Sequence, residues 1–231
     1  MVQREKMYEI NRLKERPSKE LIRGLSSFSV AMITDSMGRY GAMKPYIRPI
    51  ARGMKLSGPA FTVQTYRSDN LMLHVALEIA EEGDILVVDA GEVTNAGLCG
   101  GLMAAIALKK KLGGLVTDGA IRDSQETIES GLPVFSKSIS PLGGFKGSPG
   151  SVNVSISCGG VVVNPGDIII GDDDGVAVIP MDKAAEILEL CKKTAAKEDV
   201  IIKGINEGKT LFELFKLNEK LENINMKLPV E

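Results

Sequence analysis

The residues with the clearest chemical potential are two glycines and an Arg-Asp pair. Gly100, Gly101 and Leu102 follow a predicted loop and begin a predicted helix, whereas Arg122 and Asp123 follow a predicted strand. Backbone N–H groups at the start of a helix have no partner within it and attract an anion. An Arg binds a carboxylate through two parallel hydrogen bonds, and an Asp supplies oxygen to a cation such as Mg²⁺. These residues indicate a site for a small anion.

The predicted elements bring both segments to one edge of a sheet. A strand over 115–118 leads to the Arg-Asp pair, and a helix over 101–111 follows the glycines. Ligands of open parallel sheets gather beyond the carboxyl ends of the strands, so we expect the two loops to meet at one cleft. The structural alternative is a surface ion pair between Arg122 and Asp123 that caps the next helix.

Strands and helices alternate through the middle of the chain. Short apolar segments bounded by Gly and Pro are typical of strands, and apolar residues three or four apart are typical of helices. These patterns predict strands over 60–66, 85–89, 115–118 and 133–135, and helices over 70–81, 101–111 and 124–130. The alternation indicates an α/β fold with a parallel sheet covered by helices.

The two ends of the chain have a different character. Helices are predicted after Ser18 and over 29–37, short strands over 151–157, 160–163, 168–170 and 176–179, and further helices over 181–203 and 209–217. We therefore expect one domain over 1–231, with N-terminal helices (1–50), an α/β core (51–180) and C-terminal helices (181–231). Terminal helices of this kind often pack on a neighbouring subunit.

Composition excludes several classes of protein. Of 231 residues, 44% are hydrophobic and 25% are charged, which excludes intrinsic disorder. No apolar run reaches the roughly 18 residues that cross a bilayer. The charged residues 1–6 are not followed by an apolar signal core, so we expect a cytoplasmic protein without a membrane partner. A net charge of −2, 4% aromatic residues and no Trp argue against a nucleic-acid partner.

The remaining reactive side chains have structural explanations. Cys99, Cys158 and Cys191 lack metal-type spacing and are expected to be buried free thiols. Cys99 lies beside the glycines, but no histidine motif accompanies it, so we do not expect a nucleophile. His74 is the only histidine, which excludes any mechanism or metal site that needs two. It faces the apolar stripe of its predicted helix and is expected to be a hydrogen-bonded core residue.

Two further polar segments have open interpretations. The acidic run 172–174 has carboxylates for Ca²⁺, but its spacing differs from an EF-hand loop, and a solvated turn is favoured. Thr34 and Asp35 either lie near a site or form the polar face of a helix.

Several short motifs occur in an order that is more specific than any one of them. They are Thr34-Asp35-Ser36, Ser57-Gly58-Pro59-Ala60, residues 83–89, Gly100-Gly101-Leu102, residues 118–123, Pro133-Val134-Phe135 and residues 165–176. Over roughly residues 25–200 this series resembles the regulator of ribonuclease activity A (RraA-like) family, which includes the class II 4-hydroxy-4-methyl-2-oxoglutarate aldolases. No cofactor motif supports methyl transfer, a function with which members of this family are often labelled.

The resemblance implies a fold, an assembly and a cofactor. The fold would be a layered α/β sandwich with a β-barrel-like core and a C-terminal helical extension. Three subunits, or two such trimers, would assemble with active sites at their interfaces. Each site would hold a divalent metal, Mg²⁺ or Mn²⁺.

The resemblance also implies roles for individual residues. Asp123 would anchor the metal, and Arg122 would hold the carboxylate or carbonyl group of the substrate. Glu198 would reach the site of an adjacent subunit. Backbone amides around three residues would complete the carboxylate pocket: Gly100, Leu102 and Met103.

One position departs from the family pattern. Family aldolases carry an Asp, then twenty residues, then an Arg-Asp pair, and in this chain Gly101 stands at the position of the first Asp. Gly101 still belongs to the predicted substrate loop. A carboxylate that moves protons through a metal-bound water contributes of order 10²–10⁴ in rate, and that contribution would be absent.

The resemblance therefore implies a metal-dependent lyase that acts on a small 2-oxo acid through a pyruvate enolate. The reaction would be aldol cleavage, decarboxylation of oxaloacetate, or both. Decarboxylation is expected to persist with Gly101 because carbon dioxide leaves without loss of a hydroxyl proton. One alternative is a non-enzymatic regulator that binds a ribonuclease E-type partner. Another is a related enzyme with a different small acidic substrate, in which Gly101 makes room for a bulkier group.

Overall fold

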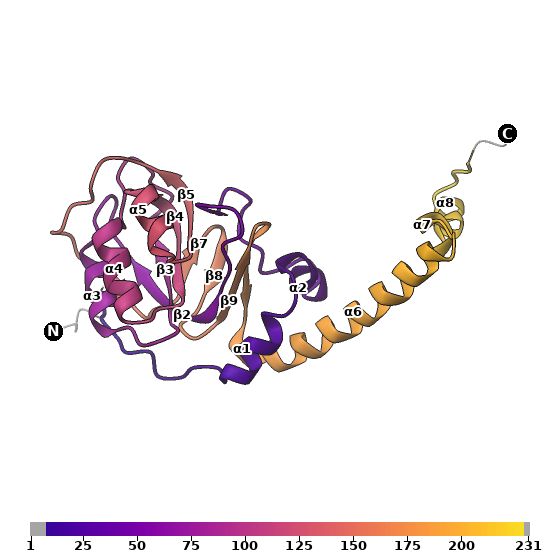
Figure 1. The fold of residues 1–231 in the computed structure, drawn as a ribbon, viewed down its shortest axis with the longest axis horizontal. Helices are drawn as coiled ribbons and strands as arrows, with labels where there is room; N and C mark the ends of the chain where they lie inside the picture. The colour runs from indigo at the N-terminus through magenta and orange to yellow at the C-terminus, as the bar shows by residue number, and fades with distance from the viewer. Residues whose placement is uncertain (1–7, 229–231) are drawn as a thin grey trace, which may run out of the picture.

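A mixed eight-stranded sheet forms the centre of the structure, a computed structural model that describes residues 8–228 (Figure 1). From one edge to the other the strands are β1 (Arg48–Pro49), β5 (Val134–Ile139), β4 (Gly114–Ile121), β3 (Ile85–Asp89), β2 (Leu56–Gln64), β9 (Ile168–Asp172) and β10 (Gly175–Ile179), with β6 (Ser151–Val152) paired to β2. Strands β2 to β5 are parallel, as predicted, and β1, β6, β9 and β10 pair antiparallel with their neighbours. Strands β7 (Ile156–Cys158) and β8 (Val161–Val163) form a separate hairpin.

Residues 41–49 connect the two edges of the sheet. Val178 N donates to Gly41 O, and Met43 N donates to Val176 O, so this segment first lies along β10. It then continues into β1, which pairs with β5 at the opposite edge. The sheet therefore curls into a nearly closed barrel, which confirms the α/β fold with a barrel-like core.

Three helices cover the outer face of the parallel strands (Figure 1). They are α3 (Leu71–Ile79), α4 (Gly101–Lys109) and α5 (Ser124–Ser130). Because successive side chains of a strand alternate between faces, Leu86 and Val88 of β3 pack toward these helices, and Ile85 and Val87 pack inside the barrel. Burial on both faces explains the continuous apolar sequence of this strand.

The remaining helices lie at the other side of the body. They are α1 (Lys19–Leu25), α2 (Val30–Ser36), the 3₁₀ turn η1 (Met181–Lys183), α6 (Ala184–Asn206), α7 (Leu211–Leu214) and α8 (Leu217–Asn223). The hydroxyls of Ser18 and Ser29 cap α1 and α2. The first turns of α6 pack on α1 and α2 through Ile187 and Cys191. The rest of α6 projects from the body and carries α7 and α8 (Figure 1).

Element boundaries differ from the prediction where tertiary pairing decides them. β2 begins at Leu56 rather than at residue 60, because its first residues pair with β9. β4 and β5 extend to Ile121 and Ile139. The predicted strand over 151–157 is two strands, interrupted near Asn153, whose φ is 53°. The charged segment 1–6 lies outside the described residues.

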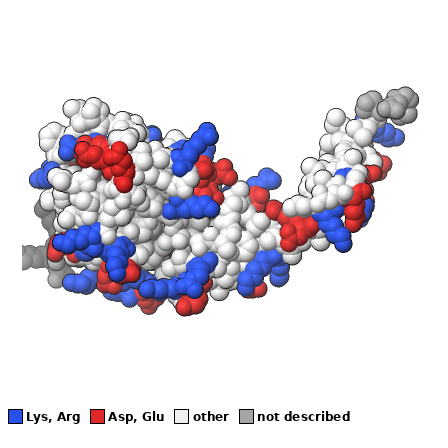
Figure 2. All heavy atoms as spheres, viewed as in Figure 1, with Lys and Arg blue, Asp and Glu red and all other residues white. Residues whose placement is uncertain are grey.

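The surface carries charges of both signs. In Figure 2, Lys and Arg are interspersed with Asp and Glu along the body and along α6 rather than gathered in one basic region. Within residues 8–228 no helix combines the length and the apolar composition that a bilayer crossing demands.

Candidate functional site

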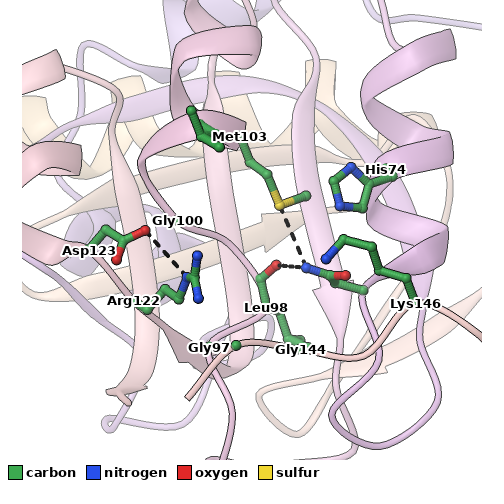
Figure 3. A pocket seen from close by; sticks show the side chains of 12 residues that line it. His74, Gly97, Leu98, Gly100, Met103, Arg122, Asp123, Gly144 and Lys146 are labelled. Carbon is green, nitrogen blue, oxygen red and sulfur yellow. Dashed lines mark hydrogen bonds and ion pairs between the residues drawn. The ribbon is translucent and has the colours of Figure 1, made fainter. Parts of the chain in front are cut away.

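A small pocket opens beyond the carboxyl ends of three parallel strands. Its walls come from the start of α3, which follows β2, from residues 97–103, which follow β3, and from Arg122 and Asp123, which follow β4. Residues 143–146 close it from one side (Figure 3). The cavity of about 160 Å³ is smaller than sites for drug-sized ligands, which span roughly 300–1,000 Å³, and it suits a ligand of a few carbon atoms.

Arg122 and Asp123 form one side of the pocket together with Gly97 and Gly100, and we call this side the Arg122 wall. Arg122 Nε lies 3.3 Å from Asp123 Oδ2. Asp123 has a left-handed backbone, with φ 50° and ψ 44°, and its side chain does not cap α5. Its carboxylate instead accepts a hydrogen bond from Gly101 N at 3.2 Å. Arg122 and Asp123 therefore form the ion pair that the sequence allowed, but the Asp123 side chain does not cap the next helix.

Glycines leave room for the Arg122 side chain. A Cβ at Gly97 would lie 2.7 Å from Arg122 Cβ, and a Cβ at Gly143 would lie 2.7 Å from a guanidinium nitrogen. A Cβ at Gly100 would collide with the Asp123 carboxylate and lie 3.1 Å from Arg122 Nε. The absence of side chains at these positions therefore allows the guanidinium to lie directly against the backbone.

Glu126, a residue to which no sequence motif pointed, approaches Gly101 at the start of α4. A Cβ at Gly101 would collide with Glu126 Oε2. The Glu126 carboxylate therefore fills the space where the side chain of the motif Asp would begin. The available signal was the position of Glu126 in the first turn of the helix that follows Asp123.

The donor set on this wall fits a hard divalent cation. Asp123 supplies carboxylate oxygens to the pocket, and Mg²⁺ commonly binds one or two carboxylates while it keeps several waters. Mn²⁺ accepts the same ligands. Within residues 8–228 no cluster of three or more His, Cys, Asp or Glu side chains has the arrangement of a metal site. Substrate oxygens and water would therefore complete the coordination.

The start of α4 offers backbone N–H groups to the same pocket. Gly101 N donates to Asp123, and Met103 N donates to Gly100 O at 3.0 Å, so both amides are engaged. Leu102 N lies in the first turn, where a helix provides no acceptor. Of these three amides, that of Leu102 is the one available to a bound carboxylate. The Leu102 side chain is 86% exposed at the pocket.

Asn70, His74 and Lys146 form the facing side of the pocket, which we call the His74 wall; His74 and Lys146 lie across from Arg122 in Figure 3. The prediction of His74 as a hydrogen-bonded core residue is wrong. The ring is half-buried and lines the pocket, and Nε2 has no hydrogen-bond partner among the described residues. Burial, and then the nearby charge of Lys146, lowers the pKa of His74, so the ring is neutral at pH 7.

Other candidates lie away from the pocket or cannot react. Glu198 is exposed on α6, which projects from the opposite side of the body (Figure 1), so its role in an adjacent subunit stays a prediction. Cys99 is buried, and burial raises its pKa to about 12, which leaves no reactive thiolate. Cys158 and Cys191 are also buried free thiols, as expected. Thr34 lies within α2 and donates to Ala31 O.

The acidic run 172–174 forms the turn between β9 and β10, as favoured from the sequence. Asp172 accepts a hydrogen bond from Val30 N at 2.9 Å, and Asp173 accepts one from Gly53 N at 2.8 Å. These carboxylates hold neighbouring segments of backbone.

Comparisons with known proteins agree with this architecture. Residues 30–178 match the RraA-like family model, described as Aldolase/RraA. A protein of Halalkalibacterium halodurans named "Putative 4-hydroxy-4-methyl-2-oxoglutarate aldolase" is 35% identical over 177 residues, which cover 76% of this chain and 84% of that protein. An uncharacterized protein of Methanocaldococcus jannaschii is 36% identical over 198 residues, which cover 84% and 92% of the two chains.

Solved structures show the same fold. The structure of Streptomyces coelicolor RraAS2, described as an unusual member of the RNase ES inhibitor RraA protein family, aligns with a TM-score of 0.72 and 31% identity over 80% of this chain and 97% of that one. An uncharacterized protein of Pseudomonas syringae pv. tomato aligns with a TM-score of 0.79 and 24% identity over 87% and 95% of the two chains.

Proposed function

Because the chain belongs to the RraA-like family, we propose that it is a divalent-metal-dependent lyase acting on a small 2-oxo acid. The reaction is cleavage of a 4-hydroxy-4-methyl-2-oxoglutarate-like aldol, decarboxylation of oxaloacetate, or both. One observation carries the proposal: the Arg122 guanidinium lies beside the Asp123 carboxylate at the glycine-lined start of α4, where Glu126 Oε2 approaches Gly101. A cationic side chain that can bind the substrate carboxylate thus lies next to an anionic side chain that can bind a metal ion.

Arg122 binds and orients the 2-oxo acid. Its planar guanidinium matches the carboxylate in a bidentate arrangement, and the N–H of Leu102 adds a donor at the positive end of α4. Gly97 and Gly143 leave the space in which the guanidinium is held. The pocket thereby sets the direction of the bound 2-oxo acid.

The same wall stabilises the charge that develops in the reaction. When the C3–C4 bond breaks, a pyruvate enolate forms, and Arg122 stabilises its oxygen through a charged hydrogen bond. Asp123 would hold Mg²⁺ or Mn²⁺, which when bound supplies Lewis-acid stabilisation of the same oxygens. Both proposed reactions pass through this enolate.

Glu126 offers a carboxylate for aldol cleavage in a chain that has Gly101 in place of the motif Asp. Retro-aldol cleavage requires loss of the C4 hydroxyl proton. A lower rate of aldol cleavage was expected because Gly101 replaces the motif Asp. In the structure the Glu126 carboxylate of α5 lies against Gly101, where the side chain of the motif Asp would begin. We propose that Glu126 performs the proton transfer assigned to the motif Asp, so that aldol cleavage is retained.

Pyruvate release from oxaloacetate tests this function. The purified protein is mixed with oxaloacetate, with and without Mg²⁺ and EDTA, and pyruvate is followed with a coupled dehydrogenase. We expect activity above the metal-only blank that requires the metal and disappears in Asp123→Ala. Asp199→Ala, an exposed carboxylate on α6, serves as the matched control. Activity no greater than the blank, with both oxaloacetate and an aldol substrate, would refute the proposal.

The likeness to the Streptomyces coelicolor protein supports a second candidate, a regulator that binds a ribonuclease E-type partner. The near-neutral charge suits contact with a protein better than contact with RNA. RNA cleavage by a purified ribonuclease E-type enzyme, with and without this protein, tests the idea. Inhibition that survives in Asp123→Ala, together with no lyase activity, would favour the regulator over the lyase.

A further inference from the structure

We propose that Asp118 is a positioning residue, which holds the loop between β3 and α4 in place against Arg122. The inference rests on the proposed function, because this loop, residues 90–100, supplies Gly97 and Gly100 to the pocket. Asp118 itself does not line the pocket. It therefore acts through the backbone that it binds and not on the reacting atoms.

Asp118 lies inside the mouth of the barrel, with 2% of its surface exposed. Val116 packs inside the barrel, and side chains two apart on a strand share a face. The charged groups that face Asp118 are Asp89, at the same level of β3, and Glu92 of the loop. Cys158 of β7 lies against it as a neutral thiol, because burial raises the pKa of Cys158.

Stability alone does not explain a carboxyl group at this place. Within residues 8–228 no Lys, Arg or His forms an ion pair with Asp118. A buried carboxylate without a cationic partner costs stability, and a neutral side chain would cost less.

The carboxylates of Asp118 and Asp89 bind the first three N–H groups of the loop. Ala90 N donates to Asp118 Oδ1 at 2.7 Å, and Glu92 N also donates to this carboxylate. Gly91 N donates to Asp89 Oδ1 at 2.9 Å. Gly91 and Glu92 have left-handed backbone, with φ 62° and 59°. This conformation is uncommon for Glu and persists only where surrounding contacts hold it.

The Glu92 side chain holds the same turn from the other side. Its carboxylate accepts hydrogen bonds from Tyr46 Oη at 2.7 Å, from Lys137 Nζ at 2.9 Å and from Lys44 Nζ at 3.0 Å. The two lysines offset the charge of Glu92. Tyr46 and Lys44 belong to the segment that connects the two edges of the sheet, and Lys137 belongs to β5. The turn is therefore fixed by contacts on both sides.

Strand β4 also holds the far end of the loop. Arg122 N donates to Cys99 O at 2.8 Å, next to the pocket. Near the start of the loop, a Cβ at Gly119 would lie 2.6 Å from Ala90 Cβ, so the loop lies directly on the strand. The stretch from Asp118 to Arg122 thus fixes both ends of the loop and carries the guanidinium. A change at Asp118 alters how the loop glycines lie against the guanidinium (Figure 3).

Protonation of Asp118 should loosen the loop. An ionised carboxylate only accepts hydrogen bonds, whereas a carboxylic acid carries an O–H donor and offers less to N–H groups. Burial raises the pKa of Asp118 to about 6, so the carboxyl group is ionised at pH 7.5 and protonated at pH 5. Asparagine is neutral at both pH values and therefore resembles the acid form.

Initial rates at two pH values test the positioning role. Pyruvate release from oxaloacetate in saturating Mg²⁺ is compared between the wild-type protein and Asp118→Asn, after subtraction of the metal-only blank. We expect kcat/KM of the variant to be about tenfold lower at pH 7.5, because small displacements in a site have effects of this size. At pH 5 the difference should narrow to about twofold, since Asp118 of the wild type is then largely protonated. His74 titrates in both proteins and does not affect this comparison.

Asp167→Asn is the matched control. Asp167 is also buried, burial raises its pKa, and it accepts a hydrogen bond from Met181 N at 3.2 Å, away from the pocket. Its replacement should keep the wild-type kcat/KM at both pH values. A loss of the same size in Asp167→Asn would show a general effect on stability and overturn the proposal.

Amide hydrogen exchange tests the loop without turnover and without a variant. After correction for the intrinsic pH dependence, exchange over residues 90–100 of the wild-type protein should be about fivefold faster at pH 5 than at pH 7.5, while β2 changes little. Equal loop exchange at both pH values, or a ratio of kcat/KM that does not narrow at pH 5, would overturn the role of Asp118. No pyruvate release from any substrate, together with loop exchange that depends on Asp118, would instead refute the lyase and leave the hold on the loop standing.

Discussion

Replacing Glu126 by Gln removes the charge of the carboxylate that lies against Gly101 and preserves the size of the side chain. Since Glu126 Oε2 occupies the space of a Cβ at Gly101, this carboxylate is the group that we propose as the replacement for the motif Asp. General acid–base catalysis contributes about 10²–10⁴ in rate. At 1.36 kcal/mol for each factor of ten, that equals about 2.7–5.4 kcal/mol of activation free energy.

We therefore expect Glu126→Gln to lower kcat for aldol cleavage by about 10²–10⁴. The decrease for oxaloacetate decarboxylation should be smaller, because no hydroxyl proton is removed. Pyruvate release from each substrate gives the two rates. Titration of each variant with Mg²⁺ distinguishes two causes of a lower rate. Extra Mg²⁺ restores the rate if metal binding is weaker, but it does not restore the rate if proton transfer is lost. Glu129→Gln, an exposed residue of the same helix, should behave as wild type.

A relocated carboxylate provides the sharper test. Gly101→Asp alone forces Glu126 to move, because any side chain at 101 meets its carboxylate. Gly101→Asp combined with Glu126→Ala returns the carboxylate to the motif position without this collision. The double variant should recover at least about tenfold in kcat over Glu126→Ala. A rate for Glu126→Gln within threefold of wild type, or a double variant without recovery, would refute the role of Glu126.

Three other predictions concern the guanidinium, pH and assembly. Gly143→Ala should displace Arg122, because a guanidinium nitrogen would lie 2.7 Å from the new Cβ. We expect kcat/KM in the oxaloacetate assay to fall by about 10-fold or more, and an unchanged value would contradict the proposed role of Arg122 at this place. Burial raises the pKa of Asp118 from 3.8 to about 6, so the folded state binds more protons, and its contribution to the free energy of unfolding should fall as pH rises through that interval. Chemical denaturation should show a flatter pH profile for Asp118→Asn, and identical profiles would disprove this. Light scattering should find three or six subunits, and Glu198→Gln should lower pyruvate release; a fully active monomer would contradict both.

Local sequence patterns were sufficient for much of the architecture. Apolar periodicity located the helices around the sheet, because the side-chain repeats of helix and strand differ. Placing Arg122 and Asp123 beside the glycines at the start of α4 required only that parallel strands end at one edge of the sheet. Boundaries were less accurate where pairing with a distant strand decides them, as at the start of β2, which pairs with β9.

Only the tertiary structure revealed the groups that complete the pocket. Periodicity identifies the inward face of α3, but it does not say whether that face meets packed side chains or a cavity, so His74 resembled a core residue. Lys146 reaches the same cavity from a loop more than seventy positions away in the chain. The Glu126 carboxylate reaches Gly101 because α5 and α4 pack together. The amino-acid sequence by itself thus determined the Arg-Asp pair and its glycine loop, whereas long-range packing decided which other side chains face them.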